Sequence, residues 1–256
     1  MANWRCLMEK LTSRKNTWIQ HVRRLASDHG YRDEQGEYVL DSVKLLREAL
    51  ECGVTVNSVL WAGEAQFDVP GAVVYTAPKE LVEYASPLKN APGPVFTVEI
   101  PEQTVPEKLE KVIVLENVQD PGNVGTVIRT ANALGMDAVI LTGACASVFG
   151  AKTARASMGA LFRQTVLELS LTELQALLKK NGLKLYGAAL SDRAQDVRKV
   201  SLHHGAVAIG SEGHGLSGEL LQICDGEIII PMQPGSESLN AGVAAAILMW
   251  ELAKTE

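Results

Sequence analysis

The chain has 256 residues, of which 46% are hydrophobic, and it carries a formal net charge of -6. A chain of this length and composition can fill one large core or two small ones, which excludes a protein that is disordered as a whole. Its four scattered cysteines form no C-x-x-C pair, so a disulfide framework is excluded and we expect reduced thiols and no metal site.

The chain carries no sign of membrane insertion. Residues 1–16 lack the apolar core of a signal peptide. The longest apolar run, residues 241–250, is far shorter than the roughly 18 residues that a membrane span needs. We therefore expect a cytoplasmic protein without a membrane partner.

Basic residues are concentrated in two stretches, although the chain as a whole is acidic. Residues 1–32 contain seven basic and two acidic residues, a local charge of +5. Residues 147–165 contain Lys152, Arg155 and Arg163 and no acidic residue. A solvated helix face and a surface for nucleic-acid phosphates both explain such stretches, and charge alone does not separate the two interpretations.

The first hundred residues predict a small α/β domain. An amphipathic helix is expected over residues 41–53, with the apolar side chains at positions 43, 45, 46 and 50 inward and Gly53 beyond its end. Apolar runs rich in β-branched residues predict strands at residues 54–62, 71–77 and 94–100. Two prolines and alternating charges follow, so we interpret residues 1–100 as one domain and residues 101–109 as a linker.

Residues 110–256 predict a second α/β domain. Short apolar strands alternate with helical patterns, which is typical of a mostly parallel sheet covered by helices on both faces. The strands are expected at residues 111–118, 137–143, 183–190, 206–213 and 227–232. The final helix has more apolar side chains than one helix face needs.

Three glycine- and asparagine-rich segments connect expected strands to expected helices in this second domain. They read NVQDPGNVGTVIR at residues 117–129, IGSEGHGLSG at residues 209–218 and IPMQPGSESLN at residues 230–240. Turns of this kind present backbone N–H groups and small residues to a ligand. One such turn is common, whereas three in one domain indicate a binding site.

The first and third segments contain residues that suit the start of a helix. Asp120 can cap free amides and Pro121 suits a first helical turn. Ser238 and Asn240 precede the final helix, and both are capping residues. Arg129 lies off the apolar stripe of its helix, which fits either a surface arginine or a functional group.

The second segment also matches G-x-G-x-x-G over residues 213–218, a pattern that binds dinucleotides when it follows a strand. Only residues 219–226 separate this pattern from the next strand, which is short for the crossover helix of a Rossmann unit. The pattern also lies late in the chain. A nicotinamide-dependent enzyme is therefore an alternative that rests on this match alone.

Taken together, the three segments resemble the motifs of the SpoU (TrmH-like) branch of the SPOUT RNA methyltransferases. Those motifs run N-x-x-D-P-x-N-x-G-x-x-x-R, G-x-E-G-x-G and I-P-M-x-x-x-x-E-S-L-N, and all three occur here in that order. The resemblance implies transfer of a methyl group from S-adenosylmethionine to a ribose 2'-OH of structured RNA. It also implies a sheet that contains a trefoil knot, and a homodimer formed through the C-terminal domain.

The same resemblance implies which side chains form the site. The expected catalytic residues are Asn123, Arg129, Glu212, Ser238 and Asn240. The expected contacts of the methyl donor are Gly210, Ile230, Met232 and Leu239. Family proposals make the arginine a base, but a guanidinium with a pKa above about 12 is an awkward base at neutral pH. We expect Arg129 to hold a phosphate and to stabilise the developing alkoxide.

The N-terminal region resembles the substrate-binding domain that often precedes SpoU catalytic domains. The resemblance rests on residues 11–16 and 31–50, although that family usually has Glu-Gly where this chain has Asp41-Ser42. Such domains usually accompany rRNA enzymes, so rRNA is the expected substrate and tRNA is the second. A non-catalytic RNA-binding ribosome-assembly protein of the same fold is a further alternative. The expected RNA contacts are Arg14, Lys15, Arg32, Lys152 and Arg155.

Overall fold

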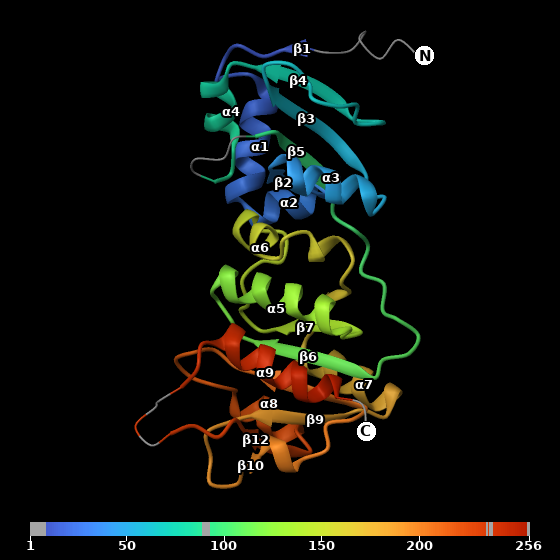
Figure 1. Ribbon diagram of the computed structural model, residues 1–256, viewed down its shortest axis with the longest axis vertical. Coiled ribbons are helices and arrows are strands. Elements are labelled where there is room, and N and C mark those ends of the chain that lie inside the picture. The colour runs from blue at the N-terminus through green and yellow to red at the C-terminus, as the bar shows by residue number, and fades with distance from the viewer. Residues whose placement is uncertain (1–8, 89–92, 234, 236–237, 255–256) are drawn as a thin grey trace. The chain divides into compact units, whose positions relative to one another are not determined.

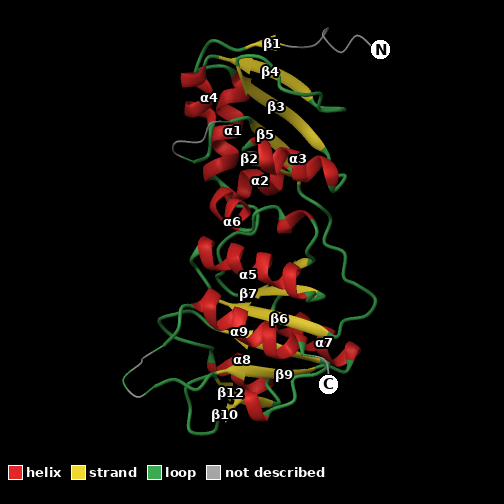
Figure 2. Ribbon diagram, viewed as in Figure 1, coloured by secondary structure: helices red, strands yellow, loops and turns green. Residues whose placement is uncertain are grey.

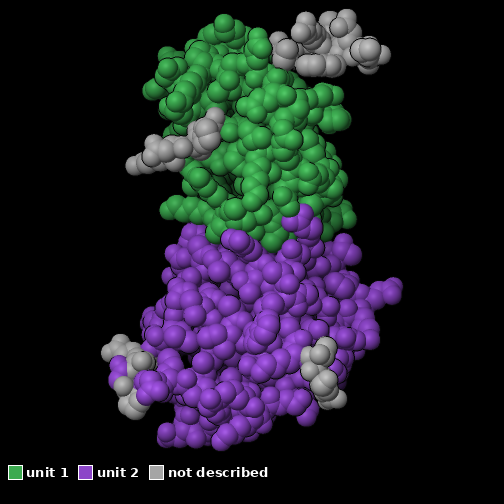
Figure 3. Space-filling view, viewed as in Figure 1, with its two compact units in different colours: residues 1–102, 149–162 green, residues 103–148, 163–256 purple. Residues whose placement is uncertain are grey.

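A computed structural model of the chain, shown in Figure 1, describes residues 9–88, 93–233, 235 and 238–254. The chain forms two compact units (Figure 3). The N-terminal unit comprises residues 1–102 and 149–162, and the C-terminal unit comprises residues 103–148 and 163–256. The sequence-based domain boundaries stay a prediction, but no sequence signal indicated that residues 149–162 would pack with the first unit.

The N-terminal unit contains a five-stranded mixed sheet in the order β1-β4-β3-β5-β2. Strand β3 is parallel to β4 and antiparallel to β5, which in turn is antiparallel to β2. The strands are β1 (Glu9–Lys10), β2 (Glu37–Asp41), β3 (Val56–Ala62), β4 (Val73–Ala77) and β5 (Val95–Glu99). The helices are α1 (Thr17–Ser27), α2 (His29–Gln35), α3 (Val43–Glu51), α4 (Lys79–Ala85) and α6 (Ala151–Ala156).

Helix α3 begins where this chain departs from the Glu-Gly of the domain that it resembles. Ser42 has a φ of 101°, a left-handed value that favours glycine. Its hydroxyl oxygen accepts a hydrogen bond from the Leu45 N–H at 3.2 Å and so caps the helix, which offsets part of the backbone strain. Asp41 accepts a bond of 2.7 Å from the Ser86 hydroxyl. The departure is therefore accommodated by local hydrogen bonds.

The predicted helix over residues 41–53 is confirmed as α3, with Gly53 beyond its end at a φ of 71°. Leu45 and Leu46 are buried as expected, whereas Val43 and Leu50 are only half-buried and Ala49 is buried instead. Position 49 lies four residues after 45 and three after 46, so it faces the core more directly than position 50 does.

Residues 149–162 supply part of the hydrophobic interior of the N-terminal unit. The ring of Phe149 lies 5.0 Å from the ring of Tyr38, centroid to centroid, and burial raises the pKa of the Tyr38 hydroxyl. Within α6, Thr153 and Ala154 are buried. Gly159 has a φ of 88°, a left-handed value that favours glycine, and a Cβ atom there would lie 2.6 Å from the Cγ atom of Glu48. The segment therefore contributes buried residues to this unit.

The C-terminal unit contains a seven-stranded sheet in the order β10-β12-β9-β11-β6-β7-β8, in which every pair of neighbours is parallel. The alternation of helices and strands can be followed in Figure 2. The strands are β6 (Lys111–Glu116), β7 (Ala138–Thr142), β8 (Val166–Glu168), β9 (Lys184–Ala188), β10 (Gln195–Asp196), β11 (Gly205–Ile209) and β12 (Gly226–Ile229). The α-helices are α5 (Pro121–Leu134), α7 (Leu171–Asn181), α8 (Gly218–Ile223) and α9 (Ala241–Ala253). The predicted parallel α/β fold is confirmed.

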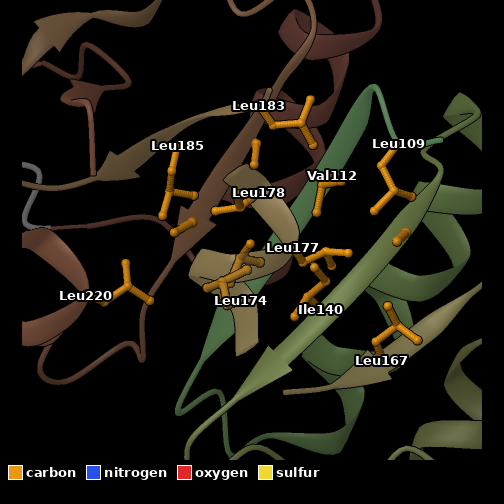
Figure 4. Close-up of a cluster of buried hydrophobic side chains, with 14 residues drawn as sticks. Leu109, Val112, Ile140, Leu167, Leu174, Leu177, Leu178, Leu183, Leu185 and Leu220 are labelled. Atoms are coloured by element: carbon orange, nitrogen blue, oxygen red, sulfur yellow. The ribbon is translucent and has the colours of Figure 1, made fainter. Parts of the chain in front are cut away.

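Helices cover both faces of this sheet. On one face, leucines of α7 pack into a cluster with side chains of five strands and with Leu220 of α8 (Figure 4). Val112 and Val114 of β6 belong to that cluster, while Ile113 and Leu115, which point to the other face, are equally buried. Helix α9 packs on β6 and β11, and α5 packs on β7 and on α9. Burial on both faces explains why these strands are uninterrupted apolar runs.

No helix in the described part of the chain has the length and apolar composition needed to cross a membrane. The expected trefoil knot stays a prediction.

Candidate active site

The three segments singled out in the sequence begin at one edge of the C-terminal unit's sheet. Strands β6, β11 and β12 end at Glu116, Ile209 and Ile229. Since these strands are parallel, their carboxyl ends lie at the same edge. Strands β6 and β11 are neighbours, and only β9 separates β11 from β12. Open α/β sheets bind their ligands at this edge.

The first segment is held by its own side chains. Asp120 is the N-cap of α5, and its Oδ1 accepts a hydrogen bond of 2.8 Å from the Asn123 N–H, while Pro121 occupies the first turn as expected. Asn117 has a φ of 55°, and its Oδ1 accepts a bond of 2.7 Å from the N–H of Ala144, in the turn after β7. A Cβ atom on Gly143 would collide with that amide oxygen. Asn117 therefore joins two neighbouring strand ends.

A chain of hydrogen bonds connects all three segments. Asn240 caps α9 through its Oδ1, which accepts bonds from the N–H groups of Gly242 at 3.0 Å and Val243 at 3.2 Å. Its Nδ2 donates to Oδ1 of Asn123 at 3.0 Å. The Nδ2 of Asn123 in turn donates to Oε1 of Glu212. We call Asn123, Glu212 and Asn240 the amide–carboxylate network.

The orientation of each amide in this network follows from its neighbour. The helix N–H groups occupy the Oδ1 of Asn240, so the Nδ2 of Asn240 faces Asn123. Asn123 must then present its oxygen to Asn240 and its nitrogen to Glu212, and a carboxylate oxygen can only accept. The cap of α9 thereby determines how Glu212 is held, although these residues lie far apart in the sequence.

The second segment folds back on itself over residues 210–217. The Gly215 N–H donates to the carbonyl of Ser211 at 2.9 Å, and Gly215 has a φ of 67°. The backbone of Gly215 and Leu216 crosses Gly210 so closely that a Cβ atom there would collide with it. Gly210 is thus required by its own loop, a reason that the sequence did not indicate. The short α8 after this loop also differs from the long crossover helix of a dinucleotide-binding turn.

Glu116 is a polar residue of this edge that sequence reasoning missed. It is 3% exposed, and its carboxylate accepts hydrogen bonds from the N–H of Ser217 at 2.7 Å and from the Ser217 hydroxyl at 2.6 Å. The available signal was an acidic residue at the end of an otherwise apolar strand, directly before the first segment. Glu116 therefore links the first segment to the second.

Arg129 lies on α5 two turns after its start and is exposed. Its guanidinium forms no hydrogen bond or ion pair with the described residues. Gly125, one turn earlier, is buried against the protein and presents no side chain beneath Arg129. The structure thus leaves all the N–H donors of Arg129 available to a ligand.

Three of the four expected contacts of the methyl donor are half-buried, and the fourth, Gly210, is buried. Ile230, Met232 and Leu239 are half-buried apolar side chains. Ser238 is exposed and does not cap α9, because the helix begins at Ala241 and the residue directly before it is Asn240. The amide–carboxylate network brings Asn123, Glu212 and Asn240 together, and it does not include Ser238.

Four of the five expected RNA contacts are exposed, and all five belong to the N-terminal unit. The exposed ones are Arg14, Lys15, Lys152 and Arg155. Arg32 is 5% exposed, and its guanidinium donates to the carbonyl of Leu25 at 2.7 Å. Desolvation lowers the pKa of Arg32, which is the expected effect of burial on a cation. Its place in the interior removes it from the surface available to RNA.

Two cysteines lie near the site's strands but are unsuited to nucleophilic chemistry. Burial, together with nearby carboxylates, raises the pKa of Cys224 to about 12. Burial also raises the pKa of Cys145, whose thiol lies 3.4 Å from the carbonyl oxygens of Leu115 and Thr142. Both thiols are therefore neutral at physiological pH, and a thiol is a much weaker nucleophile than a thiolate.

The chain is similar over nearly its whole length to known RNA-modifying proteins. The model of the SpoU rRNA Methylase family matches residues 110–250. The 23S rRNA (guanosine(2553)-2'-O)-methyltransferase RlmP of Bacillus subtilis (strain 168) is 30% identical over 248 residues, which cover 96% of this chain and 99% of the relative. An AdoMet-bound rRNA methyltransferase from Sinorhizobium meliloti has a TM-score of 0.85 and 25% identity, with 96% of this chain and 97% of that chain covered. The SpoU methyltransferase AviRb from Streptomyces viridochromogenes, in complex with AdoMet, has a TM-score of 0.83 and 25% identity over 93% and 97% of the two chains.

Proposed function

The chain belongs to the SpoU rRNA methylase family, and from this premise we propose that it transfers a methyl group from S-adenosylmethionine to a ribose 2'-OH of rRNA. The observation that carries the proposal is the amide–carboxylate network. Asn123, Glu212 and Asn240 come from three separate motifs and meet through side-chain hydrogen bonds at the ligand-binding edge of the sheet. Arg129, with its donors available, projects from the same helix as Asn123.

The residues at this edge suit S-adenosylmethionine. Half-buried Ile230, Met232 and Leu239 offer apolar surface to an adenine ring, and the turn at Gly213 has open space where a side chain would otherwise lie. Glu212 offers a carboxylate to the polar parts of the donor. The donor supplies an electrophilic methyl group on a sulfonium. Holding it close to the attacking oxygen removes most of the entropic cost of a bimolecular reaction.

The chemistry assigned to the protein's own groups is orientation and charge stabilisation. A ribose 2'-OH is a poor nucleophile that must lose its proton as the new O–C bond forms and the S–CH3 bond of the donor breaks, with a neutral thioether as the leaving group. Arg129 donates to the phosphate beside that ribose and stabilises the negative charge that develops on the 2'-oxygen. A phosphate oxygen or a water molecule accepts the proton, since a guanidinium remains protonated at neutral pH. The amide–carboxylate network keeps Glu212 in place during this step.

Replacing Arg129 tests this assignment. Arg129→Ala is expected to lower the rate of methyl transfer by about 100-fold or more while the Kd for S-adenosylmethionine changes only a few-fold. Arg129→Lys keeps the charge but loses the planar fork, so it should recover little of the rate. Arg198→Ala, which removes an exposed arginine paired with Asp196 at 2.6 Å, is the control and should leave transfer unchanged. Near-wild-type transfer by Arg129→Ala would show that the assignment is wrong.

We further propose that the N-terminal unit binds the RNA. The exposed cations Arg14, Lys15, Lys152 and Arg155 lie on this unit and would contact phosphates. Two guanidiniums, of Arg14 and Arg23, lie over the ring of Tyr84 at 4.5 and 4.2 Å from its centroid. Stacking orders both guanidiniums, and neither has a carboxylate partner among the described residues. Arg23 donates one N–H to the carbonyl of Tyr84 at 2.6 Å, and its remaining N–H groups and those of Arg14 would donate to phosphate oxygens.

We also propose that the substrate is rRNA and that the protein forms a homodimer. Ribosomal RNA is preferred to tRNA because the relatives described above act on, or are named for, rRNA. An rRNA substrate also favours a cytoplasmic location. The proposed homodimer is supported by an apolar stripe on α9, in which Val243 and Trp250 are exposed and Ile247 between them is half-buried. Val243 is 49% exposed and Trp250 is 60% exposed, so a second copy would remove a large apolar surface from water.

The remaining alternative is an RNA-binding ribosome-assembly protein that has this fold without turnover. A map of ribose methylation in rRNA and tRNA, with and without the gene, separates these possibilities. Loss of one rRNA mark supports the proposal, loss of a tRNA mark favours the second substrate, and loss of no mark favours the assembly protein.

A further inference from the structure

Glu116 has an environment that packing alone does not explain. It ends β6, its carboxylate is almost wholly removed from water, and its partners are the N–H and the hydroxyl of Ser217. Burying a carboxylate is costly unless charge-assisted hydrogen bonds compensate. An apolar side chain would complete β6 without that cost, as at the other inward positions of the strand. The carboxylate is therefore suited to holding Ser217.

Ser217 joins three parts of the C-terminal unit. Its hydroxyl donates to Oε1 of Glu116 and also accepts a bond of 3.0 Å from the Leu220 N–H, as the N-cap of α8. Its own N–H donates to the other carboxylate oxygen of Glu116. The residue lies at the end of the loop formed by residues 210–217. One side chain thus connects the end of β6, the end of this loop and the start of α8.

The loop has two arms, of which one is held from the first segment and the other from the end of β6. In the outgoing arm, Glu212 accepts from Asn123 at the start of α5. The returning arm, Gly215 and Leu216, passes directly over Gly210 and then meets its anchor at Ser217. A shift of Ser217 would therefore move the backbone that lies against Gly210.

We propose that Glu116 is a positioning residue which, through Ser217, sets the conformation of the loop over residues 210–217 and thereby the affinity for the methyl donor. This inference rests on the proposed function, because it assumes that this loop forms part of the donor site. Glu116 does not contact the donor itself, because both of its carboxylate oxygens accept hydrogen bonds from Ser217. It places the loop before the donor binds, so its loss should weaken donor binding more than RNA binding.

A matched pair of variants tests whether Glu116 positions the loop for donor binding or only stabilises the fold. Asp137 directly precedes β7, and its Oδ2 accepts from the N–H groups of Glu110 at 2.6 Å and Lys111 at 2.8 Å, at the start of β6. Glu116→Ala and Asp137→Ala each remove a carboxylate that accepts two hydrogen bonds, so both should lower the urea midpoint. Only Glu116→Ala should raise the Kd for S-adenosylmethionine, by about tenfold or more, which corresponds to about 1.4 kcal/mol. Asp137→Ala should stay within about twofold of the wild-type Kd.

If Glu116→Ala does not fold, two milder variants test whether Glu116 acts on the loop through Ser217. Ser217→Ala keeps the N–H bond to Glu116 but loses the hydroxyl, and should raise the donor Kd several-fold with an unchanged KM for RNA. Glu116→Gln keeps the shape and one acceptor, and should bind the donor at least as well as Ser217→Ala. The inference is overturned if Ser217→Ala binds the donor as wild type does, or if Glu116→Ala and Asp137→Ala change the Kd equally. Failure of the wild-type protein to bind S-adenosylmethionine would instead refute the proposed function.

Discussion

Asn240 performs two tasks that a pair of substitutions should separate. Its Oδ1 caps α9, and its Nδ2 donates to Asn123. Asn240→Asp retains a good cap, because aspartate is as favourable as asparagine at this position and its charge suits a helix N-terminus. It replaces the Nδ2 donor, however, by an oxygen that faces Oδ1 of Asn123 at about the same 3.0 Å separation. Two acceptors then oppose each other.

Turning the Asn123 amide over does not relieve this conflict. Its nitrogen would then donate to the new carboxylate at position 240, but its oxygen would face the carboxylate of Glu212. In the first orientation the amide–amide bond is lost and a carboxylate oxygen faces an amide oxygen. In the second orientation the bond to the Glu212 carboxylate is lost, and hydrogen bonds to charged groups contribute about 1.5–3 kcal/mol. If methyl transfer depends on the placement of Glu212, the rate should fall by about 10- to 150-fold. Because the cap of α9 is retained, Asn240→Asp should lower stability by less than Asn240→Ala does.

Asn240→Ala should lower both the stability and the rate of methyl transfer. It loses the cap, at a cost of about 1 kcal/mol, in addition to the bond to Asn123. Ser170→Ala is the control, because Ser170 caps α7 in a capping box and lies outside the amide–carboxylate network. It should lower stability about as much and leave methyl transfer unchanged. Urea unfolding and transfer of a labelled methyl group to rRNA measure the two quantities, and a wild-type rate for Asn240→Asp would refute the reasoning.

Further substitutions test the other surfaces. Leu239→Asp should abolish S-adenosylmethionine binding in calorimetry, because burying an unpaired carboxylate costs several kcal/mol; normal binding by a folded variant would place the donor elsewhere. Trp250→Glu puts a charge on the apolar stripe of α9 and should give a monomer in sedimentation at micromolar concentration, whereas a fully active monomeric wild type would contradict the homodimer. Tyr84→Leu removes the ring beneath two arginines and should raise the KM for rRNA several-fold without changing the donor Kd. An unchanged KM at physiological salt would argue against this RNA surface.

Residues 149–162 determine how the N-terminal unit can be tested. Removing residues 1–102 would expose Phe149, Thr153 and the backbone of Gly159, which are packed against that unit. Such a truncation would change folding and RNA binding together. Point substitutions such as Tyr84→Leu therefore test RNA binding more directly than a truncation does.

Periodicity predicted the longer elements of the fold but not the short ones or the strand order. The apolar run before Asn117 and the stripe of α5 are long enough to reveal their type. Strands β8 and β10 have three and two residues, too few for any period to show. The order of the seven strands depends on which faces the helices cover, and that is a tertiary property. The same limit applies to Arg32, since a basic residue in the sequence carries no sign of its burial.

The motifs predicted which residues would form the site but not how they contact one another. Glycine at position 210 suggested a close approach of ligand, whereas the structure provides a second requirement in the backbone of Gly215. Ser238 and Asn240 are equivalent as capping residues, and the choice between them depends on the first residue of α9. Glu116 resembles any polar strand end until its partner, 101 residues away, is known.

The double use of Asn240 explains why sequence arguments about stability and function converge on this segment. A cap must present its oxygen to the helix, and for an asparagine this leaves the NH2 group pointing away from the helix axis. Asn123 receives that group, and Glu212 is held in consequence. A serine or aspartate cap would stabilise α9 but would leave Asn123 without its donor. The structural role of Asn240 therefore accounts for a capping residue at this position, and the site's chemistry accounts for its being an asparagine.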